Sequence, residues 1–354
     1  MSKKPKHILV IRLSAMGDVA MTIPVLKAFT TQYPDVKLTV LTREFFTPFF
    51  RDLENVTVYP ADLKGKHKGI LGLYKLSKEL KNQTFSSVTS SAVEKSHIKI
   101  DAIADLHNVL RTNILKFFFF GKTFAQIDKG RAEKKALVSG ETFQQLKTTH
   151  ERYADVFREL GFTLNLANPI FPKRVELNSR IVSVIGTDSK KWIGIAPFAA
   201  HESKMYPLEL MEKVIETLSK TYKILLFGGG KKEIEILDEF QSKNEHVINL
   251  AGKLTLDEEL DVISNLDVML SMDSGNAHMA AMLGVKVVTI WGVTHPFAGF
   301  APFNQPEDFA LVSDREKFPL IPTSIYGNKY PNNYQYVSKS IFPIKIVKKV
   351  ESIL

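Results

Sequence analysis

Residues 10–29 read VIRLSAMGDVAMTIPVLKAF, an apolar strand that ends in small residues and runs through a Gly17-Asp18 turn into an apolar helix. This order of strand, turn and helix is typical of an open α/β sheet, where ligands bind beyond the carboxyl ends of the strands. An aspartate at such a turn has two interpretations. It can cap the helix by accepting hydrogen bonds from backbone amides, or it can act on a bound ligand. The stretch by itself leaves both interpretations open.

The same alternation of strand and helix continues along the chain. A helix is predicted at 20–33 and a strand at 37–42, and the pattern restarts with a strand at 192–198 and a helix at 207–220. Alternation of this kind indicates mostly parallel sheets. We therefore expect an α/β protein with two Rossmann-like domains facing each other across a cleft. The expected parts are an N-terminal domain at 1–176, a C-terminal domain at 177–340, and a closing amphipathic helix at 341–354 that could pack on either domain and is assigned here to the N-terminal one.

Composition narrows the classes of partner. The 354 residues are 44% hydrophobic and 24% charged, as in a globular protein, and no apolar run is long enough for a transmembrane segment, so a cytoplasmic protein is expected. The absence of cysteine excludes disulfides and thiolate sites. A net charge of +9 favours anionic partners. The basic residues are scattered rather than gathered in one stripe, so no nucleic-acid partner is expected.

The clearest candidate for anion binding is VMLSMDSGNAHMAAMLG at 268–284. It places Asp273, Ser274, Gly275 and Asn276 between a strand and a helix, where free amides and the helix dipole can hold a phosphate. The alternative is a well-capped helix with an ordinary buried wall. The chain has no dinucleotide-binding glycine fingerprint after the first strand and no Asp-x-Asp pair. Dehydrogenase chemistry and the common carboxylate arrangement for a metal on a diphosphate therefore lack support.

Three segments resemble the conserved blocks of glycosyltransferase family 9, the ADP-heptose:lipopolysaccharide heptosyltransferases. They are RLSAMGDVAMTIPVLKAF at 12–29, PFAAHESKMYP at 197–207 and SMDSGNAHMAAMLGVKVVTIWGVTHPF at 271–297. The resemblance implies a GT-B fold whose N-terminal domain binds the acceptor and whose C-terminal domain binds the nucleotide sugar. It also implies inversion at the anomeric carbon, with no metal and no cofactor. Asp18 matches the family's general base, and Lys204 matches the lysine that contacts the donor diphosphate.

The resemblance implies roles for further residues. On the donor side these are Glu233 at the ribose, Leu254 in the adenine pocket, and Asp273, Ser274, Gly275, Asn276 and His278 near the diphosphate and sugar. For His278 a purely structural role is the alternative. On the acceptor side the implied residues are Gly17, Arg111, Lys129, Arg131 and His150. For the charged ones among these, a solvated surface position is an equal alternative.

The implied function is transfer of heptose from an ADP-sugar donor to an acidic inner-core lipopolysaccharide, a glycolipid at the inner face of the cytoplasmic membrane. The enzyme is then expected to be cytoplasmic and peripheral on that membrane. Two alternatives are a nucleotide-sugar epimerase of the same fold and a non-catalytic nucleotide-sugar-binding protein. Two segments depart from the family pattern. The Ser- and Thr-rich segment 84–100 is expected to be irregular, and the tail 304–340 lacks the cysteines of related sequences, which leaves its role open.

Overall fold

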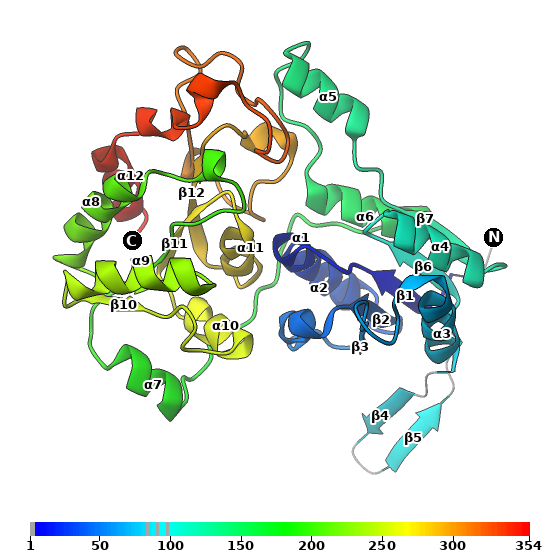
Figure 1. The fold of residues 1–354 in the computed structure, drawn as a ribbon. Helices are drawn as coiled ribbons and strands as arrows, with labels where there is room; N and C mark the ends of the chain where they lie inside the picture. Colours follow the sequence, from blue (N-terminus) through cyan, green and yellow to red (C-terminus); the bar gives the residue numbers. More distant parts are fainter. Residues whose placement is uncertain (1–3, 83–84, 90–91, 97–98) are drawn as a thin grey trace. The chain divides into compact units, whose positions relative to one another are not determined.

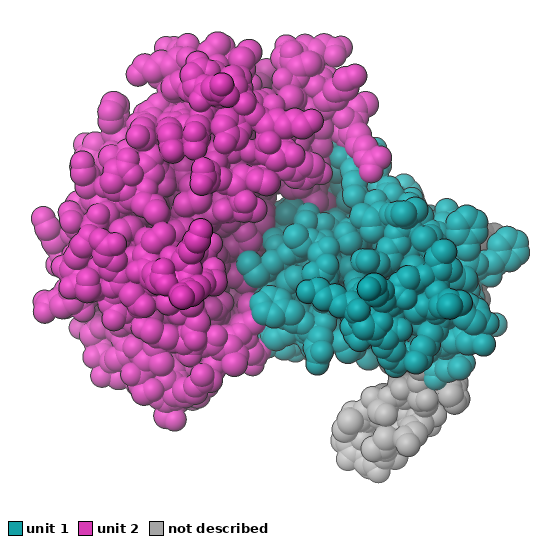
Figure 2. Space-filling view, viewed as in Figure 1, with its two compact units in different colours: residues 1–129, 150–170 teal, residues 130–149, 171–354 magenta. Residues whose placement is uncertain are grey.

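The computed structural model describes residues 4–82, 85–89, 92–96 and 99–354, and the chain divides into two compact units (Figure 1). Unit 1 comprises Met1–Lys129 and His150–Ile170, and unit 2 comprises Gly130–Thr149 and Phe171–Leu354 (Figure 2). Each unit is built around its own parallel sheet. The predicted α/β architecture with two Rossmann-like halves is confirmed.

The sheet of unit 1 has the strand order β3-β2-β1-β6-β7, and every neighbouring pair is parallel. Its strands are β1 (His7–Ile11), β2 (Lys37–Thr42), β3 (Val56–Pro60), β6 (Ala102–Asp105) and β7 (Thr123–Gln126). Its helices are α1 (Met16–Ala20), α2 (Thr22–Gln32), the 3₁₀ helix η1 (Glu44–Phe50), α3 (Gly69–Lys81), α4 (Leu110–Phe118) and α6 (Thr149–Glu159). The central strand β1 is buried along its whole length, as in a parallel sheet covered on both faces. The turn after β1 therefore lies at the sheet edge where ligands bind in such folds.

The sheet of unit 2 has the order β10-β9-β8-β11-β12-β13 and is also parallel throughout. Its strands are β8 (Trp192–Ala196), β9 (Lys223–Leu226), β10 (Val247–Asn249), β11 (Val268–Met272), β12 (Lys286–Trp291) and β13 (Ala310–Val312). Its helices are α5 (Arg131–Ser139), α7 (Ser179–Ile185), α8 (Leu208–Ser219), α9 (Lys231–Ser242), α10 (Leu256–Ser264), α11 (Gly275–Met282) and α12 (Pro343–Glu351), with 3₁₀ helices η2 (Glu202–Lys204), η3 (Pro296–Ala298), η4 (Glu307–Phe309), η5 (Asn332–Tyr334) and η6 (Val337–Ser340). Because β8 and β11 are neighbours, the loops that follow them lie at the same edge of the sheet.

The closing helix α12 packs against α8, within unit 2. Its apolar side chains Ile346, Val347 and Val350 are buried in the unit 2 core. The assignment of residues 341–354 to the N-terminal domain is therefore wrong. An amphipathic pattern identifies the buried face of a helix, but it does not identify the surface that covers that face.

The boundary between the units also differs from the expected one. Residues 130–149 belong to unit 2, where Leu137 and Leu146 pack with Ala298. The amide of Leu146 donates to the carbonyl of Phe297 at 2.9 Å, which ties this excursion to the loop after β12. Unit 2 resumes at residue 171 rather than at 177. The sequence pattern at 131–135 was interpreted as a basic turn, whereas the structure forms helix α5 there, and long-range contacts decide which unit this helix joins.

The segment 84–100 contains an antiparallel pair formed by β4 (Phe85–Thr89) and β5 (Ala92–Ser96). The expectation of irregular structure is wrong for these two strands. Residues 84, 90, 91, 97 and 98 of the segment lie outside the described residues. Small polar Ser and Thr side chains give no clear alternation of apolar and polar positions, so the strand signal was absent from the sequence.

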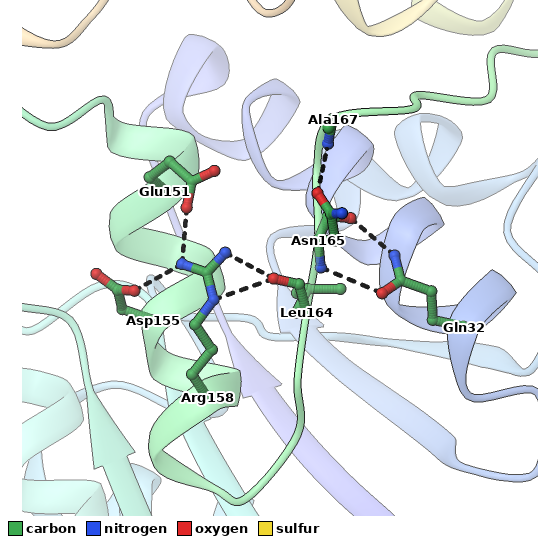
Figure 3. A network of polar contacts seen from close by, with 7 residues as sticks. All are labelled: Gln32, Glu151, Asp155, Arg158, Leu164, Asn165 and Ala167. Atoms are coloured by element: carbon green, nitrogen blue, oxygen red, sulfur yellow. Dashed lines mark hydrogen bonds and ion pairs between the residues drawn. The ribbon is translucent and has the colours of Figure 1, made fainter.

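A polar network ties the segment 150–170 into unit 1 (Figure 3). Arg158 of α6 donates to two acidic side chains of its own helix at 2.7 Å, and also to the carbonyl of Leu164. The side chain of Gln32 on α2 donates to the Asn165 carbonyl at 2.8 Å and accepts from the Asn165 amide at 3.1 Å. These bonds hold the chain that leaves α6 against α2.

Candidate active site

In unit 1, the turn between β1 and α1 presents Asp18 in the first turn of α1. Arg12 Nη2 lies 2.7 Å from Asp18 Oδ2, and the amide of Ala15 donates to the same oxygen at 3.1 Å. Oδ2 thus accepts from the amide of the N-cap residue Ala15 rather than from the first-turn amides that a capping aspartate was expected to bind. Among the described residues, no donor is bound to Oδ1, and the Asp18 side chain is 32% exposed. One carboxylate oxygen is held by the protein and the other is left for a ligand.

The loop after β6 supports this turn. Asp105, which is fully buried, accepts hydrogen bonds from the amides of His107 and Asn108 at 2.9 and 3.0 Å. The carbonyl of Leu106, inside the same loop, accepts from Arg12 Nη1 at 2.7 Å. The guanidinium that orients Asp18 is therefore anchored to the neighbouring strand end, because β6 pairs directly with β1.

Three residues around Asp18 were not predicted from the sequence. His107 is buried, and burial together with the nearby charge of Arg12 lowers its pKa to about 4, so its imidazole is neutral at pH 7. Tyr153 of α6 donates from its hydroxyl to the Asp18 carbonyl at 3.3 Å, and its ring centroid lies 5.7 Å from Arg12 Cζ. A charged residue directly after an apolar buried strand was the one signal that pointed to Arg12; nothing local indicated His107 or Tyr153.

In unit 2, the loops after β8 and β11 bring together Lys204 and Asp273. Lys204 Nζ lies 2.8 Å from Asp273 Oδ2, and the two side chains are 14% and 9% exposed. Thr294, after β12, donates to the same carboxylate oxygen at 2.9 Å. The backbone at Gly327 lies against the lysine, because a methyl group added at Gly327 would be 2.5 Å from Lys204 Cγ. The ammonium group is thus fixed by charge, by a hydrogen-bonded carboxylate and by packing.

The predicted anion-binding turn lies at the start of α11. Ser274 is the N-cap residue, and its hydroxyl lies 3.1 Å from the Ser271 hydroxyl rather than capping the helix. The first-turn amides that begin at Gly275 and Asn276 lack intrahelical acceptors, as at every helix start. They directly follow Asp273, so helix amides and the Lys204 ammonium occur at one end of the sheet. His278 is buried within α11.

The predicted ribose and adenine residues occupy separate loops of unit 2. Glu233, in the first turn of α9, accepts a hydrogen bond from the amide of Gly229 at 2.7 Å. Its carboxylate is thereby turned toward the glycine run that follows β9. Leu254 is half-buried and lies immediately before Thr255, the N-cap residue of α10. Strands β9 and β10 are neighbours, so these loops also lie at the carboxyl edge of the sheet.

The predicted acceptor residues divide between the two units. Gly17 lies beside Asp18 in α1, and Lys129 is close enough to His107 to lower its pKa. Arg111 is exposed near the start of α4, and His150 is buried at the start of α6. Arg131 begins α5, which belongs to unit 2. The structure thus gathers Gly17 and Lys129 around the Asp18 turn, whereas Arg131 lies in a different unit.

Two features are absent from the part of the chain that the structure describes. No group of three or more His, Asp or Glu side chains is arranged to hold a metal ion. No helix there combines the length and the apolar character that a membrane crossing needs.

Two curated proteins align with most of this chain in sequence. A lipopolysaccharide core heptosyltransferase, OpsX, from Haemophilus influenzae is 24% identical over 88% of this chain and 86% of its own length. A lipooligosaccharide heptosyltransferase 2 from Campylobacter jejuni is 24% identical over 96% of both chains.

Solved structures show the same fold. The family 9 glycosyltransferase from Veillonella parvula superposes with a TM-score of 0.75 at 21% identity, covering 100% of this chain and 98% of that one. Escherichia coli heptosyltransferase WaaC with ADP gives 0.66 at 18% identity, over 98% and 100%. The family model described as glycosyltransferase family 9 (heptosyltransferase) matches residues 97–319. With its two Rossmann-like units in a GT-B fold, the chain belongs to glycosyltransferase family 9, the heptosyltransferase family.

Proposed function

We propose that this protein is an inverting, metal-independent heptosyltransferase that moves heptose from ADP-heptose to an acidic inner-core lipopolysaccharide. The observation that carries the proposal is the Asp18 carboxylate at the end of the central strand of unit 1, with Oδ2 held by Arg12 and Ala15 and Oδ1 without a donor in the described chain. A general base needs this combination of fixed orientation and one available oxygen. The names of the relatives support heptose as the transferred sugar.

The proposed step is a single displacement at the anomeric carbon. The acceptor oxygen forms a bond to this carbon while the bond from the carbon to the β-phosphate oxygen breaks. Attack from the opposite side inverts the configuration, the hydroxyl proton passes to Asp18, and ADP leaves with the bonding electron pair. Arg12 keeps the accepting carboxylate oriented throughout this step.

Unit 2 supplies the proposed donor site. The leaving diphosphate gains negative charge as the bond breaks, and fixed cations and amides at that position lower the barrier. Lys204 and the first-turn amides of α11 are the groups available for this, with Thr294 holding Asp273 in place when the lysine turns to the ligand. Glu233 is proposed to bind the ribose hydroxyls, and Leu254 to line the adenine pocket.

The proposed acceptor is an anionic glycolipid at the inner face of the cytoplasmic membrane. The net charge of +9 favours such a partner. Lys129, near the Asp18 turn, is the cation placed best to contact its acidic sugar, and Arg111 lies farther along, at the start of α4. The epimerase and binding-protein alternatives gain nothing from the relatives, which are transferases.

The base role is tested by replacing Asp18 with Asn. Release of ADP from ADP-heptose with heptose-deficient lipopolysaccharide should fall by roughly 10²- to 10⁴-fold, the usual contribution of a general base. ADP binding, measured by calorimetry, should be unchanged, because the donor residues lie in unit 2. The matched control is Asp35→Asn, at an exposed position of unit 1, which should retain full turnover. Undiminished turnover by Asp18→Asn would contradict the proposed base.

The donor and the reaction class need separate tests. Thermal shift with ADP, UDP and GDP should show stabilisation by ADP alone, and a preference for UDP would overturn the donor assignment. Incubation with ADP-heptose in the absence of acceptor should leave the sugar unchanged. An isomerised sugar in that reaction would favour an epimerase.

A further inference from the structure

Unit 1 exposes large apolar side chains on two helices. On α3 these are Ile70, Leu71 and Tyr74, of which Leu71 is 85% exposed. On α4 and directly after it are Leu110, Phe117 and Phe120; the first two are 78% exposed and Phe120 is 96% exposed. Single exposed apolar residues are ordinary, but six on adjoining helices form a patch of the kind that marks an interaction surface.

The two helices are in contact and lie side by side (Figure 1). The rings of Tyr74 and Phe118 are in edge contact with centroids 5.5 Å apart, and Lys81 donates to the Phe118 carbonyl. Leu110 and Phe117 are seven residues apart and so lie on the same side of α4. We refer to the exposed residues of α3, α4 and Phe120 as the α3–α4 face.

Basic residues border this face, with little acidic charge to offset them. Residues 62–82 contain six lysines and two acidic residues, Asp62 and Glu79. Asp62 accepts hydrogen bonds from the amides of Gly65 and Lys66. Residues 110–122 contain Arg111 and two lysines and no acidic residue. Within the described parts of the chain, Lys64, Lys68, Lys75 and Lys78 form no ion pair.

Glu79, the acidic residue of α3, is 25% exposed and is engaged by three neighbouring side chains. It accepts hydrogen bonds from the Tyr59 hydroxyl and His67 Nε2, and pairs with Lys66 at 2.9 Å. Burial raises the pKa of Glu79, but these hydrogen bonds together outweigh it and lower the pKa to about 2. Its negative charge is therefore shared among Tyr59, His67 and Lys66, and Lys66 is the surface lysine with which it pairs.

From this arrangement we infer that the α3–α4 face binds an anionic lipid bilayer. Lysines attract anionic headgroups, and exposed leucine and phenylalanine enter the boundary between headgroups and acyl chains. A nucleic acid would use the lysines but gain nothing from Leu71 and Leu110. A second copy of the chain would bring like charges together across a two-fold axis.

The inference rests on the proposed function in one respect: the proposed acceptor is anchored in a membrane, and binding to the bilayer would give the enzyme access to it. Helix α4 begins five residues after β6 ends at Asp105, and β6 pairs with β1, which leads to Asp18. The start of the α3–α4 face is therefore at the same sheet edge as the proposed base. A bilayer bound to this face would hold glycolipid headgroups near that edge.

Co-sedimentation of the full chain with lipid vesicles tests the inference. The protein should bind vesicles of phosphatidylcholine mixed with phosphatidylglycerol, bind pure phosphatidylcholine far more weakly, and lose affinity as salt rises. Lys75→Glu/Lys78→Glu should weaken binding to the anionic vesicles by at least about 30-fold, since each lysine near such a surface contributes about fivefold and each glutamate adds repulsion. Leu71→Ser/Phe117→Ser should weaken it by about tenfold or more.

Matched controls lie in unit 2. Lys213→Glu on α8 with Lys220→Glu directly after it makes the same change of net charge at exposed positions, and Ile344→Ser removes an exposed apolar side chain from α12. Both should bind vesicles like the unaltered protein. The inference is overturned if the unaltered protein ignores anionic vesicles, if the α3–α4 variants bind as well as the controls, or if those variants instead lose self-association or oligonucleotide binding.

ADP calorimetry on every variant separates this inference from the proposed function. All α3–α4 variants should bind ADP normally, which also shows that they are folded. A protein that binds anionic vesicles through this face but does not bind ADP would overturn the proposed function and leave the membrane surface standing. Normal ADP binding and heptose transfer without any vesicle binding would overturn the membrane surface and leave the proposed function standing.

Discussion

Each unit places an aspartate after a strand in the middle of its sheet and pairs it with one cation, but the two pairs differ in exposure. In unit 1, Arg12 lies 2.7 Å from Asp18, whose side chain is 32% exposed. In unit 2, Lys204 lies 2.8 Å from Asp273, whose side chain is 9% exposed and whose Oδ2 also accepts from Thr294. The two ion pairs thus have nearly the same length, but the Asp18 carboxylate is much more exposed to solvent than the Asp273 carboxylate.

The difference separates a carboxylate that is available for chemistry from one that maintains structure. In unit 1 water reaches and screens the Asp18 carboxylate, which weakens the pair, although the Arg12 side chain is only 8% exposed. A buried pair cannot lose one member cheaply, because the other is left as an uncompensated charge. We therefore expect Asp18 to matter for turnover and Asp273 to matter for the stability of unit 2 and the position of Lys204.

The largest stability effect is expected from Asp273→Asn. The amide keeps the size of the side chain but leaves Lys204 without a counter-charge, which should lower the free energy of unfolding of unit 2 by about 3 kcal/mol. Both tryptophans, Trp192 and Trp291, lie in strands of unit 2. Urea unfolding followed by tryptophan fluorescence therefore reports on this unit. An unchanged midpoint would show that the pair is not structural.

Acidic pH should produce the next effect, and it should occur in both units. Burial, together with the charge of Arg12 for His107 and of Arg315 for His295, lowers each histidine pKa to about 4. Below about pH 6.5 the unfolded chain takes up a proton at each histidine, whereas the folded protein does not until about pH 4. Stability is therefore complete above pH 6.5 and falls toward pH 4, by up to about 3 kcal/mol for each histidine.

Replacing each histidine in turn assigns the effect to a unit. His107→Asn should flatten the pH dependence of hydrogen exchange in β1 and β6, and His295→Asn should flatten the pH dependence of the fluorescence transition. His246→Asn, at an exposed position of unit 2, serves as the control and should change neither slope. Equal slopes before and after both buried replacements would contradict the assignment.

The sequence predicted the two aspartates because each follows a strand and begins a helix, a pattern that is local in the chain. The partners were harder to predict. Nothing in the sequence indicates that Lys204 pairs with Asp273, 69 residues later, because that contact depends on β8 and β11 being neighbours. Arg12 was visible only as a charge at the end of a strand. His107 and Tyr153 reach the Asp18 turn through sheet order and through the return of α6 to unit 1.

The errors in the fold have the same origin. Helix α12 was recognised locally, whereas the start of α5 was interpreted as a turn. Both α12 and the segment 130–149 were assigned to the wrong half, because Val350 and Leu146 are buried by residues distant in sequence. The pair β4–β5 was missed because its strands are rich in small polar residues. Local sequence pattern thus predicted the strands and helices that carry the candidate site, whereas long-range packing determined which residues contact them.

A smaller effect is expected where packing, rather than charge, fixes the lysine. Gly327 has φ of +79°, and an added methyl group would be 2.5 Å from Lys204 Cγ. Gly327→Ala should lower the free energy of unfolding of unit 2 by about 1–2 kcal/mol and weaken ADP binding by calorimetry, because Lys204 must shift. Gly140→Ala, also in unit 2, has a similar φ of +76° but no atom within 4 Å of the added methyl group, so it should lose only the backbone strain of about 1 kcal/mol. Equal losses in the two variants would mean that contact with Lys204 is not the cause.

The smallest stability effect is expected at the residue with the largest expected effect on turnover. Asp18→Asn should lower the stability of unit 1, measured by hydrogen exchange in β1, by about 1 kcal/mol. Arg12, whose side chain is 8% exposed, loses a counter-charge, but water screens the one-third exposed Asp18 carboxylate. Arg12 keeps its bond to the Leu106 carbonyl in this variant. A loss of about 3 kcal/mol, as expected for Asp273→Asn, would make Asp18 a structural residue. The two aspartates would then be equivalent, and loss of turnover in Asp18→Asn would no longer be evidence for a base.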